Sequence, residues 1–280
     1  MRLKAFLGAL LLSAGLPLLA KDESVSFDGL EGKLHLPAQP TGRAVLLLHG
    51  FNGTMDEVGD LYADLAAELG RRGIASLRFN YSGEGERVDF IVTSTLESRI
   101  RETELAYAYL KQRLPEDRLG VNGFSLGGLT AMAVAGLHPD WFETMVLWSA
   151  ADAMDKDGDP AYSAAVQKAV REGRASYQDW TRITLTREFA VSFAGVSASH
   201  WLPNYPGAFF AIRGDKDYLP QMDPRWLSIV STENKSSLLI GGADHIFNVL
   251  DIPRPDFGRP PPAQDWISLT CLAGRCHHGV

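Results

Sequence analysis

Residues 121–128 read VNGFSLGG, and the segments on either side of this stretch decide the fold. The preceding RLGVNG is typical of a short strand, and the small-residue segment LGGLTAMAVAGL that follows is typical of a helix. Ser125 lies between them in the form Gly-x-Ser-x-Gly. Gly123 and Gly127 fit a crowded strand-to-helix turn, where a Cβ would clash with neighbouring backbone. In that context Ser125 is predicted to be an exposed nucleophile; without it, a structural serine in a turn would be the simpler interpretation.

Strands alternate with helices along most of the chain, which predicts an α/β fold with a doubly wound, mostly parallel sheet. A hairpin is expected first, over residues 24–38. The expected later strands are 43–50, 74–83, 118–123, 144–150, 207–215 and 236–242, and the expected helices are 55–73, 95–114 and 126–137. In the first of these helices, Val58, Leu61, Leu65 and Leu69 are expected on one face.

Residues 151–206 interrupt this alternation, and about 55 residues are too many for a simple connection between two strands. The segment contains a helical stretch, AYSAAVQKAVREG, and the mixed stretch WTRITLTREFAVSFAG. We expect a lid over the carboxyl edge of the sheet, with a helical crossover carrying a surface insertion as the alternative. The expected organisation is therefore a core of residues 21–150 and 207–280 with a lid of residues 151–206.

The N-terminal residues 1–20 have the pattern of a secretory signal peptide. Arg2 and Lys4 precede an apolar run that is shorter than the roughly 20 residues needed to span a bilayer. We expect cleavage and export, to the periplasm or the medium, with no stable membrane span after the signal is removed. The alternative is a buried or membrane-anchoring helix, which would keep the protein membrane-associated.

Composition limits the partners of the chain. The net charge is −7 and no segment concentrates Lys and Arg, so nucleic acid is not expected as a partner. The two cysteines, Cys271 and Cys276, favour a disulfide in an oxidising compartment, or free thiols. A metal site with His277 and His278 is the weaker alternative, because the spacing matches no standard zinc pattern.

A serine nucleophile needs a base that is oriented by an acid. Of the seven histidines, His245 follows the last expected strand, on the same sheet edge as Ser125. His200, in the expected lid, is the second candidate. The acid should lie between serine and histidine in the chain, where Asp215 and Asp217 follow a strand in IRGDKDYLP. Turn stabilisation is the alternative role for Asp215, and Asp244, beside His245, is the third candidate.

Taken together, the motifs resemble those of the α/β-hydrolase family. The resemblance runs through HGFNG (49–53), RFNYSGEGE (78–86), GFSLGG (123–128), GDKDYLP (214–220) and GADHIF (242–247), and covers about 200 residues. It implies a Ser125–Asp217–His245 triad, because the family's acid closes a G-x-x-D turn. The branch with serine aminopeptidase-like and feruloyl esterase-like enzymes is the most similar, and it implies a lid after the sixth strand.

The same resemblance implies an oxyanion hole made by the backbone N–H groups of Phe51 and Leu126. Two features depart from the family pattern. Asn122 stands where this strand is often apolar, which would fit a short strand, and residues 253–266 are proline-rich where a closing helix is common.

The leading functional hypothesis is an exported serine esterase that acts on a small-molecule ester through an acyl-enzyme, with no metal or organic cofactor. Amide or peptide hydrolysis is the first alternative. It would need a carboxylate to hold a substrate ammonium group, such as Glu84 or Glu86, although both are expected to be solvated loop residues. A non-catalytic binding protein is the second alternative. Four aromatic residues are candidates for an acyl pocket or for the core of the lid: Trp148, Trp180, Phe189 and Trp201.

Overall fold

A computed structural model describes residues 21–85, 90–115, 118–154, 159–179 and 181–249 of the chain. The expected signal peptide, the cysteine-containing tail, the proline-rich segment, Glu86 and Trp180 lie outside these residues, and the expectations for them stay predictions. Within the described ranges, no helix combines the length and the apolar character that crossing a membrane requires.

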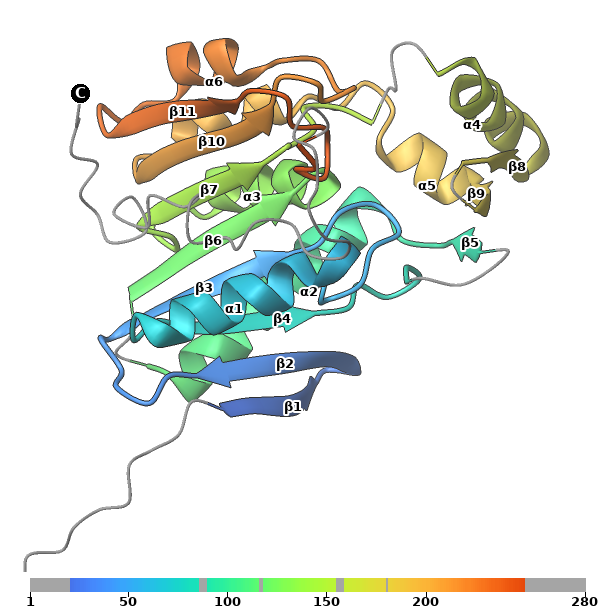
Figure 1. The fold of residues 1–280 in the computed structure, drawn as a ribbon. Coiled ribbons are helices and arrows are strands. Elements are labelled where there is room, and N and C mark those ends of the chain that lie inside the picture. The colour runs from blue at the N-terminus through green and yellow to red at the C-terminus, as the bar shows by residue number, and fades with distance from the viewer. Residues whose placement is uncertain (1–20, 86–89, 116–117, 155–158, 180, 250–280) are drawn as a thin grey trace, which may run out of the picture.

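The centre of the molecule is an eight-stranded sheet in the order β1-β2-β4-β3-β6-β7-β10-β11 (Figure 1). In this order, the neighbours from β4 through β3, β6, β7 and β10 to β11 all pair in parallel. At the other end of the sheet, β2 pairs antiparallel with both β1 and β4. The predicted doubly wound, mostly parallel sheet is therefore confirmed. Its strands are β1 (Lys21–Phe27), β2 (Leu30–Leu36), β3 (Arg43–Leu48), β4 (Ala75–Phe79), β6 (Arg118–Phe124), β7 (Thr144–Trp148), β10 (Ala208–Gly214) and β11 (Lys235–Ile240).

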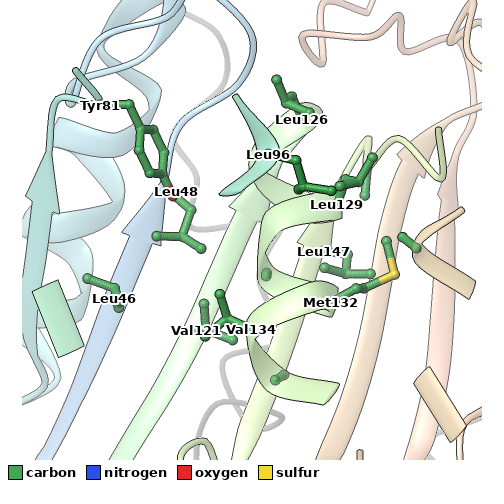
Figure 2. Close-up of a cluster of buried hydrophobic side chains, with 14 of the residues drawn as sticks. Leu46, Leu48, Tyr81, Leu96, Val121, Leu126, Leu129, Met132, Val134 and Leu147 are labelled. Atoms are coloured by element: carbon green, nitrogen blue, oxygen red, sulfur yellow. The ribbon is translucent and has the colours of Figure 1, made fainter. Parts of the chain in front are cut away.

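Helices cover both faces of this sheet, which explains the nearly continuous apolar sequence of its central strands. On β3, Val45 and Leu47 join the cluster that contains α1 (Leu61–Arg71), while Leu46 and Leu48 join the cluster beneath α2 (Leu96–Arg113) and α3 (Leu126–Leu137). Figure 2 shows Val134 of α3 beside Val121 of β6, and Met132 of α3 beside Leu147 of β7. This packing fixes the strand ends that carry the site.

The helix expected over residues 55–73 begins later than the sequence pattern predicts. Val58 to Asp60 form a 3-10 turn, η1, and Gly59 and Asp60 have φ of 63° and 61°. Left-handed residues cannot continue an α-helix, so α1 starts at Leu61. Val58 is consequently exposed, and its expected place on the buried face of the helix is wrong. By contrast, α2 begins where expected, because Thr95 caps it through the backbone N–H of Ser98.

The segment between β7 and β10 follows the sixth strand of the large sheet, and its first four elements form a lobe at the right of Figure 1. It consists of α4 (Pro160–Glu172), β8 (Arg174–Gln178), β9 (Arg182–Thr186), α5 (Arg187–Ser192), η2 (Ala198–His200) and η3 (Leu202–Asn204). A three-stranded sheet forms where β9 pairs with β8 and, in parallel, with β5 (Phe90–Val92). Asp152 holds the two ends of the insertion together, because it accepts hydrogen bonds from Ser197 and Ser199 and from Trp226 of α6 (Asp223–Ile229).

Candidate active site

Ser125 lies at the turn between β6 and α3, with φ 53° and ψ −118°. Few non-glycine residues adopt a positive φ, and those that do cluster at functional sites. A Cβ on residue 127 would stand 1.9 Å from the Leu48 carbonyl oxygen, and one on residue 123 would stand 2.4 Å from that of Gly127. The expected reason for both glycines is thus confirmed, and the turn holds the serine at the carboxyl end of the sheet.

His245 and Asp217 come together with Ser125 from two other strand ends. Asp217 follows β10 and His245 follows β11, and these strands are parallel neighbours. The distance from His245 Nε2 to Ser125 Oγ is 3.1 Å, and the distance from His245 Nδ1 to Asp217 Oδ1 is 2.7 Å. The three groups therefore stand in the serine–base–acid order that the sequence motifs predict.

Asp217 is held in its charged form. Burial raises the pKa of its carboxyl, but the hydrogen bond and charge of His245, the Leu219 N–H and the charge of Arg213 together place that pKa below its ordinary value. Arg213 Nη1 donates to Asp217 Oδ2 at 3.0 Å, and its Nε donates to Asp223 at 2.9 Å. The sequence analysis missed Arg213, which has no recognisable motif, although its position four residues before Asp217 was a usable signal.

The other candidate acids and bases have different roles. Asp215 accepts a hydrogen bond from the Gly242 N–H at 2.8 Å, which is the turn-stabilising role considered for it. The Asp244 carboxylate accepts the N–H groups of Ile246 and Asn248 in its own loop. His200 is exposed in η2, and within the described ranges it makes no hydrogen bond to Ser125.

The rings of Phe124 and Tyr218 flank His245, with centroid distances of 5.2 and 4.5 Å. They limit the rotation of the imidazole, so its two nitrogens stay directed at Ser125 and Asp217. Tyr218 is itself largely exposed to solvent.

A cavity of about 580 Å³ opens above Ser125 and His245. Most of its wall is apolar, and Met154 and Asp179 of the inserted segment contribute to it. Its main apolar lining residues are Phe51, Val58, Phe124, Met154, Leu219 and Ile246. The volume lies within the range of small-molecule sites, about 300–1,000 Å³.

Three of the aromatic candidates for the pocket are core residues instead. Trp148 packs between Tyr62 and Phe247, and Phe189 packs against Phe193 and Phe51. The backbone and Cβ of Trp201 stand over Gly136 of α3. None of these three is among the residues that line the cavity.

The segment that follows β3 lies beside Ser125 and includes both Phe51 and a buried histidine. The His49 ring accepts a hydrogen bond from the Tyr81 N–H at 3.1 Å through Nε2, so Nδ1 carries the proton and donates to the Gly50 carbonyl at 2.8 Å. Burial lowers the pKa of His49 to about 4, and the ring is neutral at physiological pH. The backbone that follows His49, rather than its ring, therefore faces the site.

Two backbone N–H groups near Ser125 have no hydrogen-bond acceptor within the described part of the chain: those of Phe51 and Leu126. Leu126 is the first residue of α3, and the first N–H groups of a helix have no intrahelical acceptor. The side chain of Phe51 packs against Phe189, so only its backbone is available for polar contact. The two predicted oxyanion-hole donors are therefore free to bind a ligand oxygen.

Two expectations about polar residues are wrong. Glu84 is not a solvated loop residue: its side chain is fully buried and forms an ion pair with Arg99, so it is not free to hold a substrate ammonium group. Asn122 does not mark a short strand, because β6 extends to Phe124 and the buried Asn122 amide donates to the Val146 carbonyl at 3.3 Å. Within the described ranges, no cluster of three or more His, Cys, Asp or Glu side chains could hold a metal ion.

Solved structures of similar fold include Est1E from Butyrivibrio proteoclasticus and a monoacylglycerol lipase from Paleococcus ferrophilus. Est1E superposes with a TM-score of 0.60 at 16% identity, covering 81% of this chain and 91% of Est1E. The lipase superposes with a TM-score of 0.62 at 17% identity, covering 80% of this chain and 93% of the lipase. At these identities the similarity is one of fold.

A curated relative, Esterase EstD from Thermotoga maritima, is 32% identical over 121 residues, which cover 41% of this chain. The aligned stretch spans only 29% of the length of EstD. The sequence profile of the family described as "Serine aminopeptidase, S33" matches residues 39–228, more than half of the chain. The match includes Ser125 and Asp217, and His245 follows it. The chain therefore belongs to the serine aminopeptidase S33 family and has the α/β-hydrolase fold.

Proposed function

We propose that this protein is a serine esterase that cleaves a small carboxylic ester through an acyl-enzyme. The observation that carries the proposal is the hydrogen-bonded series Ser125–His245–Asp217, with distances of 3.1 and 2.7 Å, at the base of a largely apolar cavity. The names of the curated relative EstD and of the structurally similar lipase point to the same class of bond.

In the proposed reaction, Ser125 Oγ attacks the ester carbonyl carbon while His245 Nε2 takes its proton. Asp217 keeps the imidazole in the required tautomer and offsets the positive charge that it gains. The N–H groups of Phe51 and Leu126 bind the oxygen on which negative charge develops. His245 then donates the proton to the departing alcohol, and a water molecule, activated by the same histidine, releases the acid and restores Ser125.

The cavity supports a substrate with an apolar part of small to medium size next to the ester. Apolar side chains surround the space next to Ser125, so burial of a hydrocarbon or aromatic group there would be favourable, at roughly 25 cal/mol per Å² of apolar surface. Est1E is a structure that has been solved with ferulic acid bound, an aromatic acid of compatible size. An amide substrate with an ammonium group is less well supported, because Glu84 is engaged by Arg99.

The experiment is a series of p-nitrophenyl esters of graded acyl length, hydrolysed by the wild type, Ser125→Ala and Ser228→Ala. Ser228 is an exposed serine of α6 and serves as the matched control. We expect activity in the wild type and in the Ser228 variant, a maximum at short to medium chains, and loss of activity in Ser125→Ala. A folded wild-type protein that hydrolyses none of these esters would contradict the proposal.

A further inference from the structure

Glu57 has a backbone conformation and an environment that are both unusual for a glutamate. Its φ is 61° and its ψ is 173°, a strained region that is used almost only by glycine. The residue is only 6% exposed. Its carboxylate accepts hydrogen bonds from the Gly50 N–H and, at 3.1 Å, from the Val58 N–H. A strained backbone with a buried acid needs a reason beyond the local turn.

The Gly50 N–H belongs to residues 49–53, the loop that follows β3; this loop, which is not a β-strand, is here called the oxyanion strand. Glu57 binds this strand at Gly50, and two further side chains bind it on either side of that point. Glu84 accepts the Asn52 N–H at 3.0 Å, and Arg99 donates to the His49 carbonyl at 2.6 Å. Among the described residues, the Phe51 N–H is the one between these anchored groups that has no acceptor. The anchoring therefore fixes the peptide that carries the proposed oxyanion donor.

The carboxylate of Glu57 is also close to the nucleophile. A Cβ built on Gly50 would stand 3.2 Å from Ser125 Cβ and 3.3 Å from Glu57 Oε1, and one on Gly53 would stand 2.9 Å from the same carboxylate oxygen. Glu57 is itself among the residues that line the cavity. Its position is thus between the oxyanion strand and the cavity wall, where a displacement would move the Phe51 peptide.

The charge of Glu57 is compatible with this position. Burial raises the pKa of its carboxyl to about 7, although the hydrogen bonds from Gly50 and Val58 and the charge of Arg99 act in the opposite direction. A full negative charge beside a developing oxyanion would oppose the reaction, and a carboxyl that is often protonated near neutrality reduces that repulsion.

We propose that Glu57 is a positioning residue for ester hydrolysis: by holding the Gly50 N–H, it keeps the oxyanion strand in the orientation in which the Phe51 N–H can bind the reacting oxygen. This role rests on the proposed function. It assigns to Glu57 no contact with the substrate and no proton transfer.

The test uses Glu57→Gly, because glycine adopts the native φ and ψ without strain and removes only the carboxylate contacts. Asp60→Gly is the matched control. Asp60 is also acidic with a φ of 61°, but it is exposed and makes no capping hydrogen bond. Glu57→Gln is the conservative variant, since its amide oxygen can still accept the Gly50 N–H.

The first readout compares an ester with its thiono analogue, in which sulfur replaces the carbonyl oxygen and binds N–H donors poorly. We expect Glu57→Gly to lower kcat for the ester by about 10- to 100-fold, less than the loss of a donor itself, with KM changed less than two-fold. The preference for the ester over the thiono analogue should shrink by a similar factor. Glu57→Gln should recover most of the activity, and Asp60→Gly should match the wild type.

The second readout is amide hydrogen exchange of residues 49–53, which does not depend on any substrate. We expect faster exchange there in Glu57→Gly than in Asp60→Gly or the wild type. Unchanged exchange in this segment overturns the positioning role, as does a lower kcat with an unchanged preference for the ester over the thiono analogue. If the wild type cleaves no ester, the proposed function fails, and the exchange experiment still decides whether Glu57 holds the strand.

Discussion

Arg213 and His245 bind opposite oxygens of the same carboxylate: Arg213 Nη1 donates to Asp217 Oδ2 at 3.0 Å, and His245 Nδ1 lies 2.7 Å from Oδ1. The guanidinium also donates to Asp223 and to the Ala150 carbonyl, at 2.9 and 2.7 Å. Arg213 therefore ties Asp217, the acid of the proposed triad, to β10 and to the segment after β7, and through Asp217 it supports the orientation of His245.

The first prediction concerns Arg213→Lys. A lysine is a point charge that cannot bind Asp217, Asp223 and the Ala150 carbonyl at once. We expect kcat to fall by about 10- to 100-fold, because misplacing the acid misaligns the imidazole. Steady-state kinetics on the best p-nitrophenyl ester measure the effect. Arg118→Lys is the control, since Arg118 forms an exposed ion pair with Glu143; equal kinetics for the two variants would contradict the role of Arg213.

The second prediction separates the two aspartates that follow β10. Asp217→Asn keeps the size of the side chain but removes the charge and favours the wrong tautomer of His245, so kcat should fall by about 10³- to 10⁴-fold. Asp215→Asn loses only a contact to the Gly242 N–H and should keep more than half of the wild-type kcat. The reverse order of effects would assign the acid to Asp215.

The third prediction concerns the buried ion pair between Glu84 and Arg99. Glu84→Gln leaves the guanidinium without its charge partner in the interior, so the free energy of unfolding should fall by about 3 kcal/mol. Glu172→Gln breaks an exposed pair with Lys168 and should cost less than about 1 kcal/mol. Urea unfolding at pH 7 measures both values. If Glu84→Gln is no more destabilised than Glu172→Gln, the buried pair does not stabilise the region behind the oxyanion strand.

The fourth prediction concerns the pH dependence of stability through Glu57. Burial raises the pKa of this carboxyl from its ordinary value of 4.5 to about 7 in the folded protein. Between these values the folded state binds one more proton than the unfolded state, so the free energy of unfolding decreases as the pH rises. Across the whole interval the decrease amounts to about 3 kcal/mol. The charged groups that act on Glu57 are Arg99 and Glu84.

Glu57→Gln removes the titrating carboxyl, so the decrease in the free energy of unfolding that this carboxyl causes should disappear. Urea unfolding of the wild type and of the variant is measured between pH 4.5 and 7.5. The quantity compared is the difference between their free energies of unfolding at each pH. The difference is needed because His49, with a pKa of about 4 in the folded protein, titrates with the opposite sign over part of the same range. Asp60→Asn, which removes an exposed carboxyl close to Glu57 in the chain, is the control for the loss of a carboxyl in this loop. A difference between the wild type and Glu57→Gln that does not change with pH would contradict the prediction.

The proximity of Ser125, Asp217 and His245 was predictable from the sequence, because each residue follows a recognisable buried strand. The mostly parallel sheet, the starting hairpin and the insertion after the sixth strand also agree with the sequence pattern. Parallel strands bring their carboxyl ends to one edge, so the strand pattern alone places Ser125, Asp217 and His245 near each other.

The groups that hold the site were not predictable, because they depend on contacts between distant segments. The partners Arg99 and Glu84 lie on α2 and on the loop after β4, and the local sequence of neither segment signals that they pair. The parallel pairing of β5 with β9 joins segments about 90 residues apart, for which the local pattern carries no signal. The late start of α1 depends on two left-handed residues, of which only Gly59 was an evident signal.

The central claim is that Ser125 is the nucleophile of an acyl-transfer reaction. A fluorophosphonate probe reacts covalently with an activated serine, and mass spectrometry of the intact protein and its peptides locates the adduct. We expect one adduct per chain on Ser125 in the wild type and in Ser228→Ala, no adduct in Ser125→Ala, and greatly slowed labelling in His245→Ala. Labelling of another serine, or an equal rate of labelling in Ser125→Ala, would contradict the account.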